Sequence, residues 1–452
     1  MEIEAITSLL ENLLRIGRKK NLDLELFYSY TNVSETVIES NKVKSSTLIE
    51  NSGLGIRVIN SEKKCAFSST NDLSNKSHLE TLIEKTINTA KIGTSNSYAS
   101  LAFPKTKTTS SKGEIVDIDP SENMLFTKDL FNHFIGIDSR LNIDYGNSIS
   151  GQIVEILVST NDVVLQDLNE RSAWVIYGLA NDGTTITSSD VSYGAEKGLD
   201  FSYNFENLDL MAYRLLSHMN AKKVDLGKFK SLNAIFSPEP FIEGILMPLF
   251  TAFNGKKFLR KESPFTDQLG EELFPNISII DDGTKKNSLG TIIFDREGNK
   301  PQKISLVDKG IFSSIFHNQF SANEAGQEPT GHAGGSYRTQ PSITHHNIDF
   351  LYLKNKMDYS DILNSSDASI LINGIASYPD YVTGELQGPL KNSFLVLKGE
   401  QIPIKELTIS GNIYSNLKDG IMESSIEDYK IKLLSSEYSV PRIKFNKFKF
   451  IK

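Results

Sequence analysis

Cysteine and long apolar runs are nearly absent from this sequence. It contains one cysteine, Cys65, and no stretch near the roughly 20 apolar residues that a membrane-spanning helix needs. One cysteine excludes an internal disulfide and an all-cysteine metal site, and predicts a reducing cytoplasm. Cys65 lies in a strand-like segment without a neighbouring histidine, so we expect a small buried apolar residue. The first residues carry acids where a signal peptide has its basic region.

The sequence also lacks a net positive charge. The chain has 48 Lys and Arg against 56 Asp and Glu, a formal net charge of −8 at pH 7. A negative surface repels phosphate backbones at long range. Nucleic acid is therefore not expected as a partner, and neither is a membrane.

The common signatures of catalytic sites are absent too. The sequence has no phosphate-binding glycine loop and no nucleophile elbow. A zinc helix needs two histidines on one face and a glutamate beside the first, yet none of the seven histidines precedes a glutamate. A site drawing on His332, on His345 or His346, and on Asp295 or Glu297 stays open, although adjacent histidines in a strand point to opposite faces.

What the sequence does contain is a globular pattern of helices and strands. Its 452 residues are 39% hydrophobic and 23% charged, enough for two or three domains. Apolar spacing predicts helices over 3–20 and about 71–92, with Asn71 or Asp72 as cap, and short meander strands between them. A similar series of a helix, several strands and a second helix comes next in the sequence, and Ser121 is the expected N-cap of its first helix. We interpret 1–92 and 119–222 as an internal duplication joined by a linker, 93–118.

Beyond about residue 226 the spacing of apolar segments changes to closely spaced strands. The prediction is an α+β fold of two domains. The first, 1–225, has helix-flanked antiparallel sheets, and the second, 226–452, is β-rich.

Two segments of the second domain are candidates for a functional site. In 237–260, a proline-led apolar helix carries Glu243, and Gly244 gives the backbone room where Pro248 would collide with the carbonyl four residues back. In 328–338, three glycines allow close approach of a ligand, although composition alone favours a mobile surface loop. Candidates for a peptide-binding groove are His332, Tyr337, Arg338, His345 and His346.

Several short motifs, in order along nearly the whole chain, resemble the TldD/PmbA family, and more closely its PmbA (TldE) branch. They are SGLGIRVI and AFSSTNDL near the N-terminus, then IIFDREG, TGHAGGSYR, YVTGELQGP, VLKGE and ELTISGN. In that family TldD carries an HExxxH metal motif that PmbA/TldE lacks, and the two resemble partners in a zinc peptidase for unfolded or modified peptides. The TGELQGP segment departs from the acidic-aromatic version of relatives, so no site residue is transferred through it.

The resemblance implies that FIEGILMPLF is a vacated zinc helix, marked by Glu243, Gly244 and Pro248. Zinc is then expected in a TldD-like partner and no cofactor in this chain, which would be a non-catalytic subunit that helps to confine peptide. Two alternatives stay open: a stand-alone peptide- or protein-binding regulator, as in the older view of gyrase modulators, and an independent hydrolase with a metal site among the scattered histidines. A homodimer is a further alternative.

Overall fold

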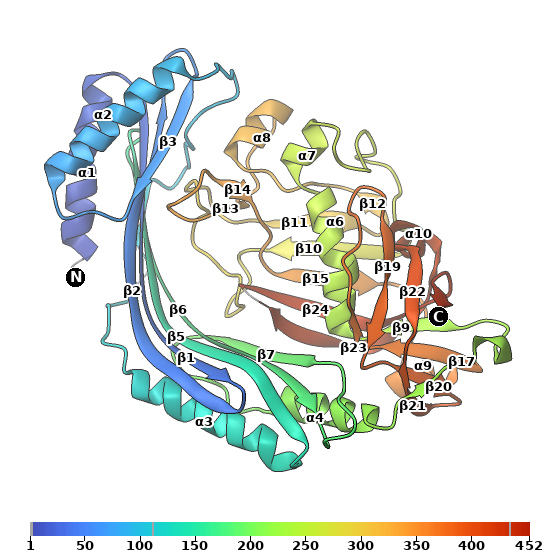
Figure 1. The fold of residues 1–452 in the computed structure, drawn as a ribbon. Coiled ribbons are helices and arrows are strands. Elements are labelled where there is room, and N and C mark those ends of the chain that lie inside the picture. Colours follow the sequence, from blue (N-terminus) through green and yellow to red (C-terminus); the bar gives the residue numbers. More distant parts are fainter. Residues whose placement is uncertain (1–2, 111–112, 434) are drawn as a thin grey trace.

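The computed structural model describes residues 3–110, 113–433 and 435–452. It has the expected α+β fold of two domains (Figure 1). A large curved sheet with helices on its outer side forms the N-terminal domain, and a β-rich C-terminal domain lies on the inner side of the curve.

The N-terminal sheet has the strand order β3-β2-β1-β5-β6, with β7 and the short β4 both paired to β6. The elements of its first half are α1 (Ile3–Lys19), β1 (Asp23–Glu39), β2 (Lys42–Ile59), β3 (Cys65–Thr70) and α2 (Lys76–Ile92). After β4 (Thr108–Ser110), the second half has α3 (Pro120–Ile137), β5 (Leu141–Ser159), β6 (Val163–Ala180), β7 (Asp190–Lys197) and α4 (Glu206–His218).

The expectation of short meander strands was wrong for this sheet. Strands β1, β2, β5 and β6 are 17 to 19 residues long and run unbroken through polar segments that resemble turns in the sequence. The outward-facing polar groups of these segments are bonded to α3. For example, the Asn123 side chain donates to the backbone oxygens of Ser34 and Ser148. A polar residue can therefore continue a strand when a helix supplies its partner.

The outer face of the sheet carries two separate cores. Helices α1 and α2 cover the half that contains Leu26 and Ile156, and α3 and α4 cover the half that contains Ile38 and Trp174. Two caps differ from expectation. Asn75 rather than Asn71 or Asp72 caps α2, and Asp119 rather than Ser121 caps α3, because Pro120 takes the first helical position.

Both halves of the domain have the same order of helix, three paired strands and helix, and β1 meets β5 at the centre. This order accords with a duplication, but the repeats 1–92 and 119–222, the linker and the boundary at 225/226 stay predictions.

The C-terminal domain is built on a mixed twelve-stranded sheet of order β12-β11-β10-β15-β24-β9-β17-β20-β21-β8, with β16 and β23 at one side. These strands are β8 (Lys222–Lys223), β9 (Asn233–Phe236), β10 (Ile277–Asp282), β11 (Lys303–Asp308), β12 (Ile311–Phe312), β15 (Ile348–Tyr352), β16 (Lys356–Met357), β17 (Ala368–Ile372), β20 (Phe394–Leu397), β21 (Glu400–Lys405), β23 (Ile421–Leu433) and β24 (Ser436–Phe445).

Smaller elements surround this sheet. A four-stranded sheet contains β18 (Gly374–Ile375), β19 (Glu385–Lys391), β22 (Thr408–Asn412) and β25 (Lys449–Ile451), and a hairpin contains β13 (Ala333–Gly334) and β14 (Ser342–Ile343). The short helices outside the central one are η1 (Leu226–Lys228), α7 (Gly255–Leu259), α8 (Gln319–Ala325), α9 (Tyr359–Asn364) and α10 (Ile413–Asp419). Within the described residues, no helix is both long and apolar enough to cross a membrane.

The inner face of the N-terminal sheet is covered at one end by loops of the C-terminal domain. Phe27 and Leu157 of the sheet form a cluster with Phe294 and Tyr337. The Tyr337 ring lies so close to β2 that a Cβ on Gly53 would meet its Cε2 at 2.0 Å. Glycine at this position therefore admits the ring and helps to seat one domain on the other.

Replacement of Gly53 by alanine should destabilise the protein by roughly 1–3 kcal/mol, because the new methyl group must displace a buried ring. The matched control is Gly136→Ala in α3, where an added Cβ would meet nothing within 4 Å. That change should be neutral or stabilising by up to about 1 kcal/mol. Urea unfolding of both variants checks this, and equal midpoints would contradict the role of Gly53.

Candidate functional site

The central helix of the C-terminal domain is one helical run with a widened turn in its middle. It consists of α5 (Pro238–Phe241), a π-helical turn η2 (Ile242–Leu246) and α6 (Met247–Ala252). The N–H of Met247 donates to the oxygen of Ile242, five residues back. Pro248 has no N–H to donate, so an ordinary α-helical ladder would be broken here. π-turns inside α-helices occur frequently at functional sites.

Gly244 was expected to make room for this irregularity. A Cβ at that position would meet only Ile375 Cδ1, at 3.7 Å, which is an ordinary contact. This distance concerns neighbours outside the helix, and the role of Gly244 opposite Pro248 stays a prediction.

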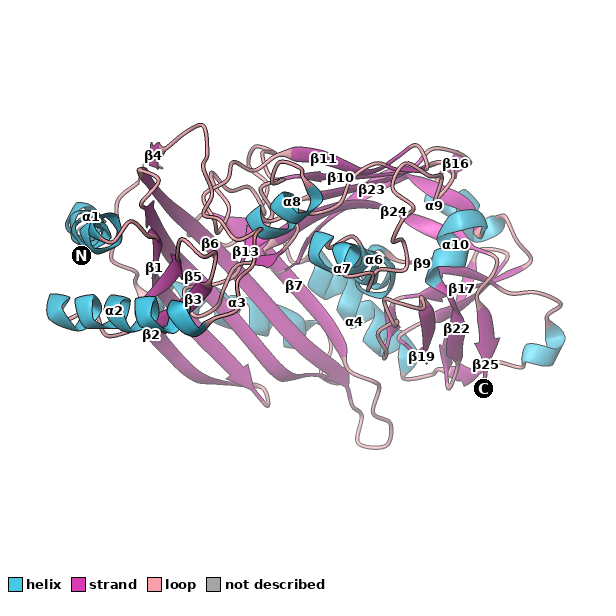
Figure 2. Ribbon diagram, turned by 90° about the horizontal axis from the view of Figure 1, so that it is seen from above, coloured by secondary structure: helices cyan, strands magenta, loops and turns pink. Residues whose placement is uncertain are grey.

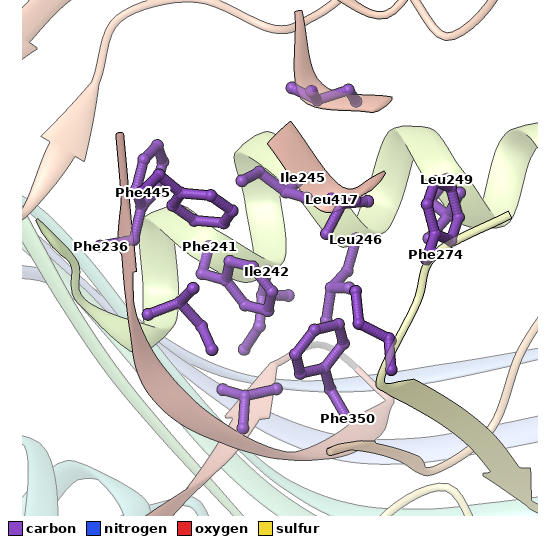
Figure 3. Close-up of a cluster of buried hydrophobic side chains, with 14 of the residues drawn as sticks. Phe236, Phe241, Ile242, Ile245, Leu246, Leu249, Phe274, Phe350, Leu417 and Phe445 are labelled. Atoms are coloured by element: carbon purple, nitrogen blue, oxygen red, sulfur yellow. The ribbon is translucent and has the colours of Figure 1, made fainter. Parts of the chain in front are cut away.

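One side of the central helix fills the main core of the domain (Figure 3). Phe241, Ile242, Ile245, Leu246 and Leu249 are fully buried there, and Phe241 meets Phe350 edge to face with ring centroids 4.8 Å apart. These side chains stabilise the helix by burial of apolar area. In this respect the helix is a core element.

The other side carries polar groups toward the N-terminal sheet. Glu239 and Glu243 act electrostatically on Tyr193 of β7, and together with burial, the larger cause, they raise its pKa well above 10.0. Burial and the neighbouring Glu239 also raise the pKa of Glu243. Near the end of the π-turn, the Tyr438 hydroxyl lies 3.8 Å from the Met247 sulfur and 2.6 Å from His345 Nε2.

A buried ion cluster joins the two domains at the covered end of the inner sheet face. It consists of Glu25 and Arg57 from the sheet and Arg296 and Glu297 from the C-terminal domain. Arg57 contacts Glu25 and Glu297, each at 2.6 Å, and Arg296 contacts Glu25 at 3.1 Å. All four side chains are at most 9% exposed. The Arg296 guanidinium also lies 3.8 Å from the centre of the Phe27 ring.

The loop that presents Arg296 and Glu297 is held by Asp295. Its carboxylate accepts the backbone N–H groups of Glu297, Asn299 and Ala333 at 2.9 to 3.0 Å. Burial and the charge of Glu297 nevertheless raise the pKa of Asp295 to about 7. Both carboxylates that the sequence left open as metal ligands, Asp295 and Glu297, are thus engaged in structural bonds.

A second pair of carboxyl groups lies along the inner face of the sheet. Glu155 of β5 is the direct cross-strand neighbour of Asp167 on β6. Burial, with a further contribution from Asp167, raises the pKa of Glu155 to about 7. The free energy of folding is therefore linked to pH through Glu155.

The candidate histidines lie in two places. His332 and His346 are 0% and 4% exposed, and their ring centres are 4.7 Å apart. His332 Nδ1 bonds Thr330 at 2.9 Å, and its Nε2 lies 3.4 Å from Asp281. His346 bonds the oxygen of Gly331 at 2.8 Å, while His345 points away to Tyr438. The structure therefore brings His332 and His346 together and separates His345 from them.

The glycine-containing segment 328–338 is packed rather than mobile on the surface. His332, Ala333 and Tyr337 are buried. Gly331 has a positive φ of 76°, and a Cβ on it would meet the oxygen of Lys300 at 2.3 Å. Composition favoured a surface loop because it does not reveal contacts with segments distant in sequence. Arg338 is exposed and donates from Nε to the Tyr337 hydroxyl at 3.0 Å.

Metal-binding geometry is not found in the described part of the chain. No group of three or more His, Cys, Asp or Glu side chains there could hold a metal ion. Cys65 is partly exposed at the start of β3, and burial, the larger cause, raises the pKa of its thiol.

Sequence reasoning missed Glu239, Tyr193 and the pairing of the ion cluster, of which it had named Glu297 alone, as a possible metal ligand. Arg57 and Arg296 belong to the motifs SGLGIRVI and IIFDREG, so the motifs did mark these positions. Their pairing was not visible because Arg57 and Glu297 are 240 positions apart.

Comparison with known proteins shows sequence similarity over most of the chain. Family models described as PmbA/TldA metallopeptidase C-terminal domain and domain 1 match residues 230–452 and 24–90. An uncharacterized protein of Methanocaldococcus jannaschii is 26% identical, covering 92% of this chain and 95% of its own length. A metalloprotease TldD homolog of Buchnera aphidicola is 24% identical, covering 87% and 83%.

Solved structures share the fold. TldE from Thermococcus kodakarensis superposes with a TM-score of 0.84 at 19% identity, covering 98% of this chain and 100% of that one. A protein from Thermotoga maritima, described as a putative modulator of a DNA gyrase, gives 0.81 at 16% identity, covering 99% and 100%.

Replacement of Arg57 by methionine should destabilise the protein by roughly 3–5 kcal/mol, because two buried carboxylates then share only Arg296. The control is Arg18→Met, which breaks a pair with Asp162 whose side chains are 48% and 70% exposed. That loss should stay below about 1 kcal/mol. Urea unfolding measures both, and similar losses would argue against a structural role for the ion cluster.

Replacement of Glu155 by glutamine should change the pH dependence of stability. The folded-state pKa of about 7 exceeds the ordinary 4.5, so the charge destabilises the fold increasingly as pH rises from 4.5 to 7. We expect Glu155→Gln to match the parent near pH 4.5 and to exceed its free energy of unfolding by roughly 1–3 kcal/mol at pH 8. Urea midpoints across this range test it. The exposed control Glu11→Gln should give no such gain in the free energy of unfolding. If the stability of Glu155→Gln changed with pH in parallel with that of the parent, the raised pKa of Glu155 would be refuted.

Proposed function

This chain belongs to the PmbA/TldD metallopeptidase family, and on that premise we propose that it is a TldE-like, non-catalytic subunit of a metallopeptidase. Its TldD-like partner would hold the zinc, and the substrate would be an unfolded or modified peptide in the cytoplasm. The observation that carries the proposal is the central helix, which lies in the family's C-terminal domain but offers no set of zinc ligands.

The central helix can be compared with the HExxxH pattern residue by residue. If Glu243 stands for the glutamate, Ile242 and Met247 stand where the two histidines would be. Those positions are five residues apart, and the π-turn joins them by a backbone hydrogen bond. Ile242 has no lone pair and packs in the core (Figure 3). Zinc sites in proteins use cysteine thiolates, histidine nitrogens and carboxylate oxygens, and the thioether of Met247 is none of these, so the residues at the two histidine positions do not fit zinc.

The subunit would contribute surface for an extended peptide. Strand β3 ends the N-terminal sheet and, among the named strands of the described residues, pairs with β2 alone, so its outer edge can receive a further strand beyond the Lys64–Ser95 bridge. Among the groove candidates, Arg338 is exposed and can touch peptide directly. Tyr337, His332, His345 and His346 would act behind it by holding the loop.

A stand-alone regulator is the second candidate, favoured by the solved neighbours that are described as putative modulators of DNA gyrase. It requires saturable binding to a target protein without any TldD-like chain. A homodimer is compatible with this second candidate. If the chain works without a TldD-like partner, no other subunit competes with a second copy of the chain for the same interface.

The decisive assay compares this chain alone, with added zinc, and the same chain mixed with a TldD-like partner on an uncharged unfolded peptide. We expect co-elution of the two chains at micromolar concentration and chelator-sensitive cleavage only in the mixture. In the mixture, Glu243→Gln should change kcat/KM by less than about threefold, whereas loss of a catalytic base costs roughly a hundredfold or more. Cleavage by this chain alone, abolished by Glu243→Gln, would overturn the proposal.

A further inference from the structure

One part of the inner sheet face is left uncovered by the C-terminal loops. We call it the lower inner face. Its side chains alternate with those that pack on α3 and α4, as the period of two in a strand requires. Its residues are Val33, Glu35 and Val37 of β1, Asn147 and Ile149 of β5, Ala173, Val175 and Tyr177 of β6, and Val191 and Tyr193 of β7. None of them belongs to a hydrophobic cluster of the described residues.

This face is apolar but still partly accessible. Val33, Ile149, Ala173 and Val175 are only partly buried, and Tyr177 is 42% exposed. The register places these residues in successive rows, such as Glu35, Ile149, Ala173 and then Asn147, Val175, Tyr193. An unpartnered apolar sheet face of this kind is typical of a binding surface.

The central helix faces this surface with unpaired negative charge. Glu239 and Glu243 form no ion pair with any described residue. Two basic groups nearby are engaged elsewhere: Arg214 bonds Asp190 at 2.6 Å, and Lys432 bonds Glu196 at 2.5 Å. Arg171 and Lys197 lie opposite each other at the upper border of the face, where Arg171 donates to the backbone oxygen of Leu289 in a C-terminal loop at 3.3 Å.

Tyr193 lies between the lower inner face and the central helix. It stands in a row of the lower inner face, and burial, followed by the nearby carboxylates of Glu239 and Glu243, raises its pKa. That hydroxyl is buried and has no hydrogen-bond partner among the described residues. A buried polar group without a partner calls for a donor or acceptor that the chain itself does not supply. In Figures 1 and 2, β7 is the strand of the N-terminal sheet on the side of the central helix.

We propose that the lower inner face binds an extended peptide whose lysine or arginine side chain is received by Glu239 and Glu243. In an extended chain, side chains on one face repeat every 6.6 to 6.8 Å or so, which is also the spacing of successive rows of the sheet. Apolar side chains of the peptide would then rest on Val175 and Ile149 while the cation reaches the two carboxylates. A peptide with a positively charged side chain is the proposed ligand because its charge complements that of Glu239 and Glu243. The inference rests on the proposed function and specifies its substrate class.

The test is fluorescence anisotropy of the full chain with three labelled eight-residue peptides, in which valine alternates with lysine, glutamine or glutamate. We expect the lysine peptide to bind about tenfold more tightly than the glutamine peptide at low salt, and the glutamate peptide more weakly than both. The advantage should shrink with added salt, because partly exposed charges are screened. The double variant Glu239→Gln with Glu243→Gln should abolish it.

The matched control is Glu11→Gln with Glu122→Gln, which changes the net charge equally at exposed positions of α1 and α3 on the outer side. It should keep the preference for lysine. Equal affinity for all three peptides, equal losses in both double variants, or no binding up to 1 mM or so would overturn the inference. The proposed function is tested by a different result: it fails if this chain does not co-elute with a TldD-like chain.

Discussion

The buried ion cluster of Glu25, Arg57, Arg296 and Glu297 is the interaction on which the arrangement of the two domains depends. Removing four charged groups from water is costly, and only a complete set of short contacts offsets that cost. The cluster therefore favours one seating of the C-terminal domain on the sheet. Phe27 under Arg296 and Gly53 under Tyr337 add close packing that fits the same seating. This contact covers one end of the inner face and leaves the other end to face the central helix.

The central helix shows how one element serves both a core and a surface. Its apolar side would hold the helix in place even without a metal, since five large side chains are fully buried. Its opposite side carries two carboxylates that nothing in the described chain neutralises. In a relative with histidines on such a helix, zinc would add to the stability of the site. Here packing alone supports the backbone, including the irregular turn before Pro248.

Much of the fold follows from local patterns in the sequence. The apolar stripe of α1, the helical spacing in α2 and the change to dense strands after α4 predicted the fold class, and short motifs in order indicated the family. Contacts between distant segments could not be predicted. Polar residues such as Ser34 resembled breaks in strands because their partner, Asn123, lies 89 positions away. For the same reason His332 was placed in an exposed loop, although its burial depends on contacts with Asp281 and His346.

The central pairing of the N-terminal sheet has a consequence for synthesis. Glu25 of β1 lies opposite Ser159 of β5, so one long edge of β1 has no partner until much later sequence has left the ribosome. Non-local strand pairs form slowly because the intervening loop must close first. An open edge of this length can meanwhile pair with other chains. The nascent protein therefore passes through a stage at which chaperones have a defined strand to protect.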